Sequence, residues 1–320
     1  MRHSRYYRTQ LNQQEQTVYD ILVEAMEKMA PEVTLSAFDT SKTQQILDAL
    51  NMDNPHLFYV DFYKSQVWHS PLRTRVVLHY VFTREMVQSM QQRINQEVAP
   101  IIQACQGKKG KELASCIHDW LVLRGAYGTD TSHPQDAHTI VGMLLYKKCV
   151  CEGYAKAFQY IADAVGLLSL VVFGDAEHPD GTGGGHAWNI VRWKGKCYQI
   201  DTTFDGIIGK SFCSRAYFCL STNQISRDHK FSSDFKLPDC PEYGGDLVLV
   251  DGTRKLMDFL AQEHQKGAAY SEVRLSRGFA SGELMDKVKK KLTMKDWIWY
   301  GKIDKWWYGE QQKSVFVTWK

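Results

Sequence analysis

Several features that define other protein classes are missing from this chain of 320 residues. It contains no run of about 18 apolar residues, so no membrane-spanning helix is expected. The basic N-terminal residues Met1–Arg8 lack the apolar stretch of a signal peptide. No CxxC pair or HExxH motif indicates a bound metal. The net charge of +3 is small, so neither nucleic acid nor an anionic membrane is expected as a partner.

Cysteine is also sparse. Eight cysteines in 320 residues are far fewer than a disulfide scaffold needs, so we expect mostly reduced, buried thiols. Reduced thiols and the missing signal peptide favour a cytoplasmic protein, and a secreted or cell-surface location is the alternative. The composition is 44% hydrophobic and 23% charged, which is typical of a globular protein with two or three domains at this length.

Hydrophobic periodicity predicts the same order of elements at both ends of the chain. Near the N-terminus, a helix over 12–29 and a strand over 32–36 precede a second helix around Ile46–Leu50 and strands over 57–68 and 73–83. The pattern α-β-α-β-β recurs about 240 residues later, where Glu272–Ser276 resembles Glu32–Ser36. We therefore predict two related α/β modules, 1–92 and 239–320, flanking a central domain, 93–238. Chance similarity of common α/β patterns is the alternative.

The central domain is organised around Cys151. Helices are predicted over 86–104, 111–124 and 139–145, and a further helix begins at Cys151 and ends before Gly166. A thiol at a helix N-terminus meets free N–H groups and the positive end of the helix dipole, which favour the thiolate. Strands are predicted over 169–174, 187–193 and 196–201. The Gly-rich, acidic stretch 175–185 is expected to be a loop, with 182–185 as a mobile flap over the site.

The hairpin turn at Lys194-Gly195 places two more reactive side chains. If Trp193 pairs with Lys196, then His186 lies one diagonal step from Asp201 on the same face, because strand faces alternate with period two. The carboxylate can then orient the imidazole, and the imidazole can take the thiol proton of Cys151. Cys151, His186 and Asp201 are therefore the predicted catalytic set.

The segments Val150–Ala155, Gly185–Asn189 and Asp201–Asp205 resemble the transglutaminase-core superfamily, in particular bacterial transglutaminase-like proteins. His118–Leu121, Tyr127, Tyr217–Ser221 and Asp228-His229 are also similar to that group, so the resemblance covers roughly residues 100–235. It implies an α+β, papain-like fold and a Cys151–His186–Asp201 triad. Where the family has Gly before the Val of the cysteine motif, this chain has Cys149. Nothing resembles the calcium sites of the animal enzymes, so no metal or other cofactor is expected.

The resemblance implies protein cross-linkers, deamidases, cysteine proteases or peptide-glycan amidases. We therefore expect a cysteine-dependent acyltransferase or hydrolase that acts on peptide or protein amides through a thioester. A catalytically silent scaffold that binds protein or glycan is the alternative. The indole N–H of Trp120 is the candidate second oxyanion donor. The remaining candidates for the substrate cleft are Tyr154, Trp188 and Asp205.

Overall fold

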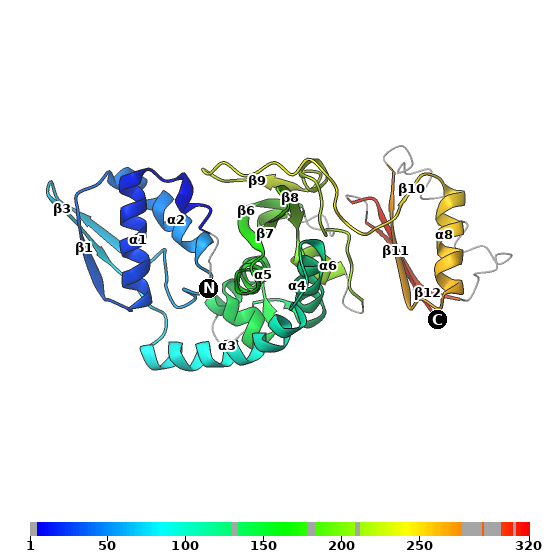
Figure 1. Cartoon of the computed structure of the whole chain (residues 1–320), viewed down its shortest axis with the longest axis horizontal. Helices are drawn as coiled ribbons and strands as arrows, with labels where there is room; N and C mark the ends of the chain where they lie inside the picture. The colour runs from blue at the N-terminus through cyan, green and yellow to red at the C-terminus, as the bar shows by residue number, and fades with distance from the viewer. Residues whose placement is uncertain are drawn as a thin grey trace.

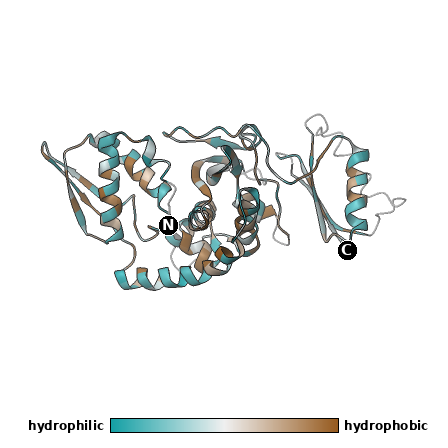
Figure 2. Ribbon diagram, in the orientation of Figure 1, coloured by the Kyte–Doolittle hydropathy of each residue, from teal (hydrophilic) through white to brown (hydrophobic). Residues whose placement is uncertain are grey.

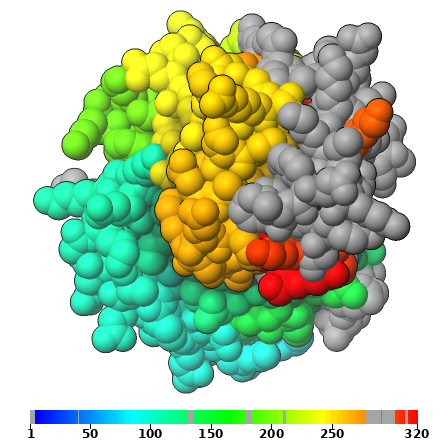
Figure 3. All heavy atoms as spheres, turned by 90° about the vertical axis from the view of Figure 1, so that its right-hand side faces the viewer, coloured from blue at the N-terminus to red at the C-terminus, as the bar shows by residue number. Residues whose placement is uncertain are grey.

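The computed structural model describes residues 5–129, 134–177, 183–208, 212–276, 290, 302–309 and 312–320. Three bodies lie in a row, with the core between an N-terminal and a C-terminal module (Figure 1). Helix α3 (Arg84–Ala104) runs along one edge from the N-terminal module to the core. Seen from the C-terminal end, helix α8 (Thr253–Gln265) and the last strands lie in front of the core (Figure 3).

In the N-terminal module one helix packs on a small antiparallel sheet, and a second helix packs on the first helix and against the core. Asn12 begins α1 (Gln13–Glu27) through a reciprocal capping box with Glu15. The sheet has the order β1-β3-β2. The elements are α1, β1 (Glu32–Ser36), α2 (Thr43–Asp53), β2 (Gln66–His69) and β3 (Arg73–Val77), with short 3₁₀ turns η1 (Arg8–Gln10) and η2 (Thr40–Lys42). The strands predicted over 57–68 and 73–83 are shorter than expected. Residues 57–65 turn repeatedly and bury Phe58, Tyr59 and Phe62, whereas Tyr63 is exposed.

The core places one central helix against a four-stranded antiparallel sheet of order β8-β7-β6-β9. Helix α5 (Cys151–Val165) packs on β6 and β7 and ends at Gly166, whose φ of 80° is left-handed. Figure 2 shows hydrophobic residues concentrated in these central elements, whereas α8 is mainly hydrophilic. The elements before α5 are α4 (Lys111–Arg124), β4 (Ala126–Tyr127), η3 (Pro134–His138), η4 (Gly142–Tyr146) and β5 (Lys148–Cys149). Those after it are β6 (Leu168–Glu177), β7 (Gly183–Trp193), β8 (Lys196–Ile200), α6 (Thr202–Ile208), α7 (Thr222–Ile225) and β9 (His229–Phe231).

One prediction for the core is wrong. Gly183–Gly185 were expected to belong to a mobile flap, but they extend β7 and pair with β6, Gly183 opposite Glu177 and Gly185 opposite Asp175. The backbone ladder therefore continues through the glycines up to the point where the described part of this hairpin ends. Residues 175–177 of the predicted loop likewise belong to β6, and residues 178–182 lie outside the described residues.

The C-terminal module has strand order β10-β11-β13-β12, with α8 beside the sheet. Its strands are β10 (Leu249–Val250), β11 (Tyr270–Leu275), β12 (Ile303–Gly309) and β13 (Ser314–Trp319). The order β11-β13-β12 is that of β1-β3-β2 in the N-terminal module, and both triplets are antiparallel. A different strand order would have contradicted a duplication of the module. The shared order agrees with a duplication, which stays a proposal. The helix predicted from Ser281 lies outside the described residues.

Gly153 tests how tightly the cysteine-bearing end of α5 is packed. A Cβ there would lie 2.5 Å from the Ala137 carbonyl oxygen and 2.6 Å from Cβ of Cys149. Gly153→Ala gains about 1 kcal/mol of helix propensity. The overlap with fixed backbone costs more, so we expect the variant to lose roughly 1–3 kcal/mol of unfolding free energy in urea titrations. Gly184→Ala, where a Cβ meets nothing within 4 Å, is the control. A Gly153→Ala variant as stable as the wild type would contradict this packing.

Candidate functional site

Cys151 is the first residue of α5, and Val150 precedes it as N-cap in an extended conformation. Strand β5, which directly precedes Val150, pairs with β4, with Lys148 opposite Ala126 and Cys149 opposite Tyr127. The Cys151 side chain is 9% exposed and packs against Val171 and Ala187 of the sheet. The thiol thus sits between a helix N-terminus and the β6–β7 face, as the sequence predicts.

The β7–β8 hairpin has the predicted register, with Trp193 opposite Lys196 and Asn189 opposite Ile200. Asp201 follows the last paired residue, and its Oδ2 lies 2.7 Å from Nε2 of His186. Both side chains are buried. The structure therefore brings His186 and Asp201 together, and the turn geometry alone was enough to predict this contact.

Asp201 accepts four hydrogen bonds, although it is fully buried. Its Oδ1 accepts from the backbone N–H groups of Thr203 and Phe204 at 2.9 and 3.1 Å and so caps α6. Its Oδ2 lies near two imidazoles, those of His186 and His229, at 2.7 and 3.1 Å. Burial raises the pKa of Asp201, but the two histidines more than offset this effect, and the pKa lies well below its usual value.

His186 connects this carboxylate to the thiol. Burial lowers the pKa of His186, but the charge and hydrogen bond of Asp201, together with those of Cys151, raise it to about 10. Because Nε2 contacts Asp201, Nδ1 is the ring nitrogen that remains for the Cys151 thiol. An imidazolium held between a carboxylate and a thiol at a helix N-terminus is suited to stabilise a thiolate.

His229 extends this chain of contacts, and the sequence reasoning gave it no distinct role. Strand β9 pairs with β6 and places His229 opposite Ala176. Its Nδ1 contacts Asp228 at 2.6 Å, and Asp228 in turn accepts from Tyr217 Oη at 2.6 Å and from Gln312 Nε2 at 3.1 Å. Burial lowers the pKa of His229, but Asp201 and Asp228 raise it above its usual value overall. Gln312 belongs to the C-terminal module, so a continuous path of polar contacts joins that module to Asp201.

Trp120, the predicted second oxyanion donor, belongs to α4. Trp120 lies beneath the Arg124 guanidinium and the Lys147 ammonium, 4.7 and 5.7 Å from its ring. His118 on the same helix faces α6, and the oxyanion role of Trp120 stays a prediction.

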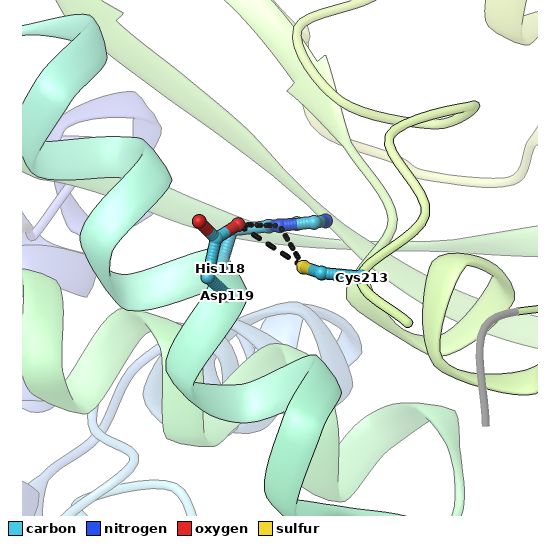
Figure 4. Close-up of side chains that lie close together, drawn as sticks. All are labelled: His118, Asp119 and Cys213. Carbon is cyan, nitrogen blue, oxygen red and sulfur yellow. Dashed lines mark hydrogen bonds and ion pairs between the residues drawn. The ribbon is translucent and has the colours of Figure 1, made fainter. Parts of the chain in front are cut away.

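Tyr154, Trp188 and Asp205 are buried rather than exposed in a cleft. The hydroxyl of Tyr154 packs against Gly125. The Trp188 ring stacks on the His186 ring, with 6.1 Å between the ring centroids. Its indole N–H donates to Gln199 Oε1 at 2.9 Å, which holds the Trp188 ring beside the imidazole. Asp205 contacts His118, which forms a second polar cluster with Asp119 and Cys213 (Figure 4).

Cys149 is fully buried, and burial, with the charge of Cys151, raises the pKa of its thiol well above the usual value. All eight cysteines are free, in agreement with the expectation of reduced thiols. Within the described part of the chain, two groups of side chains have the donors to hold a metal ion. His186, Asp201 and His229 are all buried; in the second group His118 is buried, and Asp119 and Cys213 are partly accessible.

Two hollows lie where the N-terminal module meets the core. One, of about 340 Å³, includes Phe173, which packs against the cluster that contains Cys151. The other, of about 330 Å³, includes Glu152, the neighbour of Cys151 in the chain. Asn51 and Tyr63 of the N-terminal module line both hollows.

A cysteine-bearing helix packed on an antiparallel sheet that carries the histidine defines an α+β core of the papain-like class. Residues 96–201, which lie within the core, match the family model of the transglutaminase-like superfamily, so this part of the chain is transglutaminase-like. This match supports a cysteine-type enzyme. No curated protein matches the chain.

Solved structures show weak overall similarity. A TGase crystal structure is 12% identical, with a TM-score of 0.32 over 69% of this chain and 59% of that chain. The periplasmic domain of TgpA from Pseudomonas aeruginosa is 12% identical, with a TM-score of 0.28 over 43% of this chain and 55% of that one. The chain thus spans less than two thirds of either structure. None of its described helices combines the length and hydropathy that a membrane span requires.

The electrostatics of His186 can be tested through Asp201→Asn. Loss of the carboxylate charge is expected to lower the pKa of His186 by roughly 1–3 units in histidine NMR titrations. The raised folded-state pKa of His186 stabilises the wild type fully below about pH 6.5, and this stabilisation is lost as pH rises towards 10. The unfolding free energy of the variant should therefore fall less steeply over this window.

Asp258→Asn, at an exposed position on α8, is the charge-matched control. Parallel pH profiles of wild type and Asp201→Asn would show that Asp201 does not set the charge state of His186.

Proposed function

We propose that this protein catalyses cysteine-dependent acyl transfer or hydrolysis on peptide or protein amides, with Cys151, His186 and Asp201 as the catalytic residues. The observation that carries the proposal is the buried 2.7 Å contact between His186 and Asp201, with the Cys151 thiol on the other side of the same imidazole. The match to the transglutaminase-like superfamily agrees with this chemistry.

In the proposed reaction, the Cys151 thiolate attacks the acyl carbon and forms a tetrahedral oxyanion. Free backbone N–H groups at the start of α5 are placed to stabilise that charge. The His186 imidazolium then gives its proton to the departing amine, which leaves a thioester on Cys151. Water or a second amine attacks the thioester, and His186 takes the proton of that nucleophile. Asp201 keeps the imidazole oriented throughout.

Access to the sulfur is expected along the boundary with the N-terminal module. The two hollows described above meet at Asn51 and Tyr63, and the Tyr63 side chain is 78% exposed. Lys156 connects the two sides, because its ammonium donates to Asn51 Oδ1 at 2.8 Å and pairs with Glu152 at 2.7 Å. A polypeptide lying along this boundary would pass next to the helix end that carries Cys151.

A silent scaffold is the second candidate, and the burial of Cys151 favours it. Only 9% of the residue is exposed, and Val171 and Ala187 cover its inner side. Under this alternative the triad is a structural remnant, and the modules bind a protein or glycan without turnover.

A thiol-reactive amide probe separates the two candidates. Wild-type protein at neutral pH is expected to be labelled on Cys151. Cys151→Ala should abolish labelling, and His186→Ala should slow it by roughly 10³-fold, because the thiolate loses its imidazolium. Both variants should keep the circular dichroism spectrum of the folded chain.

Cys116→Ala removes a partly exposed thiol from α4 and serves as the control, with unchanged labelling expected. Absence of Cys151-dependent labelling in the intact protein would favour the scaffold, and full labelling of His186→Ala would refute the triad.

The type of reaction is then determined with a library of glutamine-containing peptides, with and without an added amine, followed by mass spectrometry. Backbone cleavage indicates a protease, conversion of glutamine to glutamate a deamidase, and amine incorporation a transglutaminase.

Tyr63 tests the proposed approach path. Tyr63→Ala removes the ring shared by both hollows, so we expect KM for a peptide substrate to rise roughly 3–10-fold while kcat and alkylation of Cys151 by iodoacetamide stay unchanged. Tyr63→Phe should retain most of the affinity. Leu72→Ala, at an 81% exposed position that lines neither hollow, is the control. Unaltered KM in Tyr63→Ala would place substrate binding elsewhere.

A further inference from the structure

A second cysteine–histidine–carboxylate cluster lies outside the Cys151 site. His118 and Asp119 are consecutive residues of α4, and Cys213 comes from the segment that follows α6 (Figure 4). Oδ1 of Asp119 lies 2.9 Å from Nδ1 of His118 and 3.2 Å from Sγ of Cys213, and Nδ1 and Sγ are 3.9 Å apart. Three potential ligand atoms of different chemistry therefore converge on one point.

We propose that His118, Asp119 and Cys213 form a Zn²⁺-binding site. Zinc binds imidazole nitrogen and carboxylate oxygen at about 2.0–2.2 Å and thiolate sulfur at about 2.3 Å, so tetrahedral ligands lie about 3.5 Å from one another. The three separations observed here bracket that value. A mixed set of sulfur, nitrogen and oxygen donors suits a borderline-soft ion such as zinc better than calcium or magnesium, which prefer oxygen donors alone.

The surroundings of His118 match those of a metal-binding histidine. Its Nε2 contacts Oδ2 of Asp205 at 3.0 Å, and both side chains are fully buried. Asp205 is itself held by Ser214 Oγ at 2.9 Å and by the backbone N–H of Tyr217 at 3.0 Å. A carboxylate bonded to the far nitrogen fixes the tautomer, so that Nδ1 can present its lone pair to an ion.

Asp119 is oriented in a similar way. Arg215 binds its other oxygen, Oδ2, at 2.5 Å, which leaves Oδ1 directed towards His118 and Cys213. An ion at this point would replace the protons that now bridge these three atoms, one from the thiol and one from the imidazole. Asp119 is 34% exposed and Cys213 is partly exposed, so a water molecule can complete the tetrahedron as fourth ligand.

The position of the site gives the ion a structural role. It would join α4 to the segment that begins at Cys213, and the next residues of that segment dock the C-terminal module. Ser214 Oγ lies 2.9 Å from Oε1 of Glu272 on β11, and the backbone N–H of Arg215 donates to Oε2 of the same residue at 2.8 Å. Zinc is therefore expected to stabilise the docked module.

Cobalt substitution tests the proposal on the full-length chain. Chelator-treated protein is titrated with Co²⁺ and then with Zn²⁺, and the metal content is measured after dialysis. We expect one ion per chain and a sulfur-to-cobalt charge-transfer band in the near ultraviolet, because thiolate is a ligand. Bound Zn²⁺ should displace the cobalt band and raise Tm.

Cys213→Ala identifies the ligand without disturbing the buried His118. This variant should lose the charge-transfer band and the rise in Tm with zinc, whereas Cys116→Ala, which removes another partly exposed thiol, should keep both. Cys151→Ala should also keep both, which separates this site from the proposed catalytic thiol. The proposal is overturned if wild-type protein retains no ion after dialysis, or if the band survives in Cys213→Ala.

Discussion

The arrangement of the core depends on one buried carboxylate. Asp201 has no exposed surface, and an isolated charge in such a place would be very costly. Two backbone N–H groups at the start of α6 and two imidazoles, from β7 and β9, compensate for the lost hydration. Removal of one member of this buried, hydrogen-bonded set would leave the Asp201 charge uncompensated. The charge therefore fixes the position of each partner. The start of α6, the side chain of His186 and the position of β9 are therefore one coupled unit.

The sequence predicts the parts of this unit that depend on local geometry. Lys194 and Gly195 both have positive φ, as a two-residue hairpin turn requires, and the turn sets the register that brings His186 to Asp201. His229 could not be placed in this way, because it reaches Asp201 only through the pairing of β9 with β6, which no turn between them defines. The surroundings of Trp120 could not be predicted either, because the neighbours of each side of α4 depend on packing: His118 contacts α6, and Trp120 lies against Arg124 and Lys147.

The two flanking modules show how similar sequence segments acquire different surroundings. Glu32 and Glu272 occupy matching positions in the predicted repeat. Glu32 lies on an outer strand and pairs with Arg75 at the surface. Glu272 is buried against the core, where it binds Ser214 and Arg215, and burial together with the charge of Asp205 raises its pKa to about 7. The same strand position is thus a surface ion pair in one module and a docking contact in the other, and only the tertiary contact distinguishes them.

Helix α6 lies between the two cysteine–histidine clusters. Asp201 caps its first turn and binds His186, and Asp205, four residues later, binds His118 on α4. The two carboxylates are one helical turn apart, so they cannot move independently. A displacement of α6 that lengthens the His118–Asp205 contact would also move the backbone that Asp201 caps, and with it the orientation of His186. Zinc bound at His118, Asp119 and Cys213 would join α4 to the segment that follows this helix, and His118 would keep its contact with Asp205 on α6. The proposed zinc site and the proposed catalytic triad therefore differ in chemistry, but both depend on the position of α6.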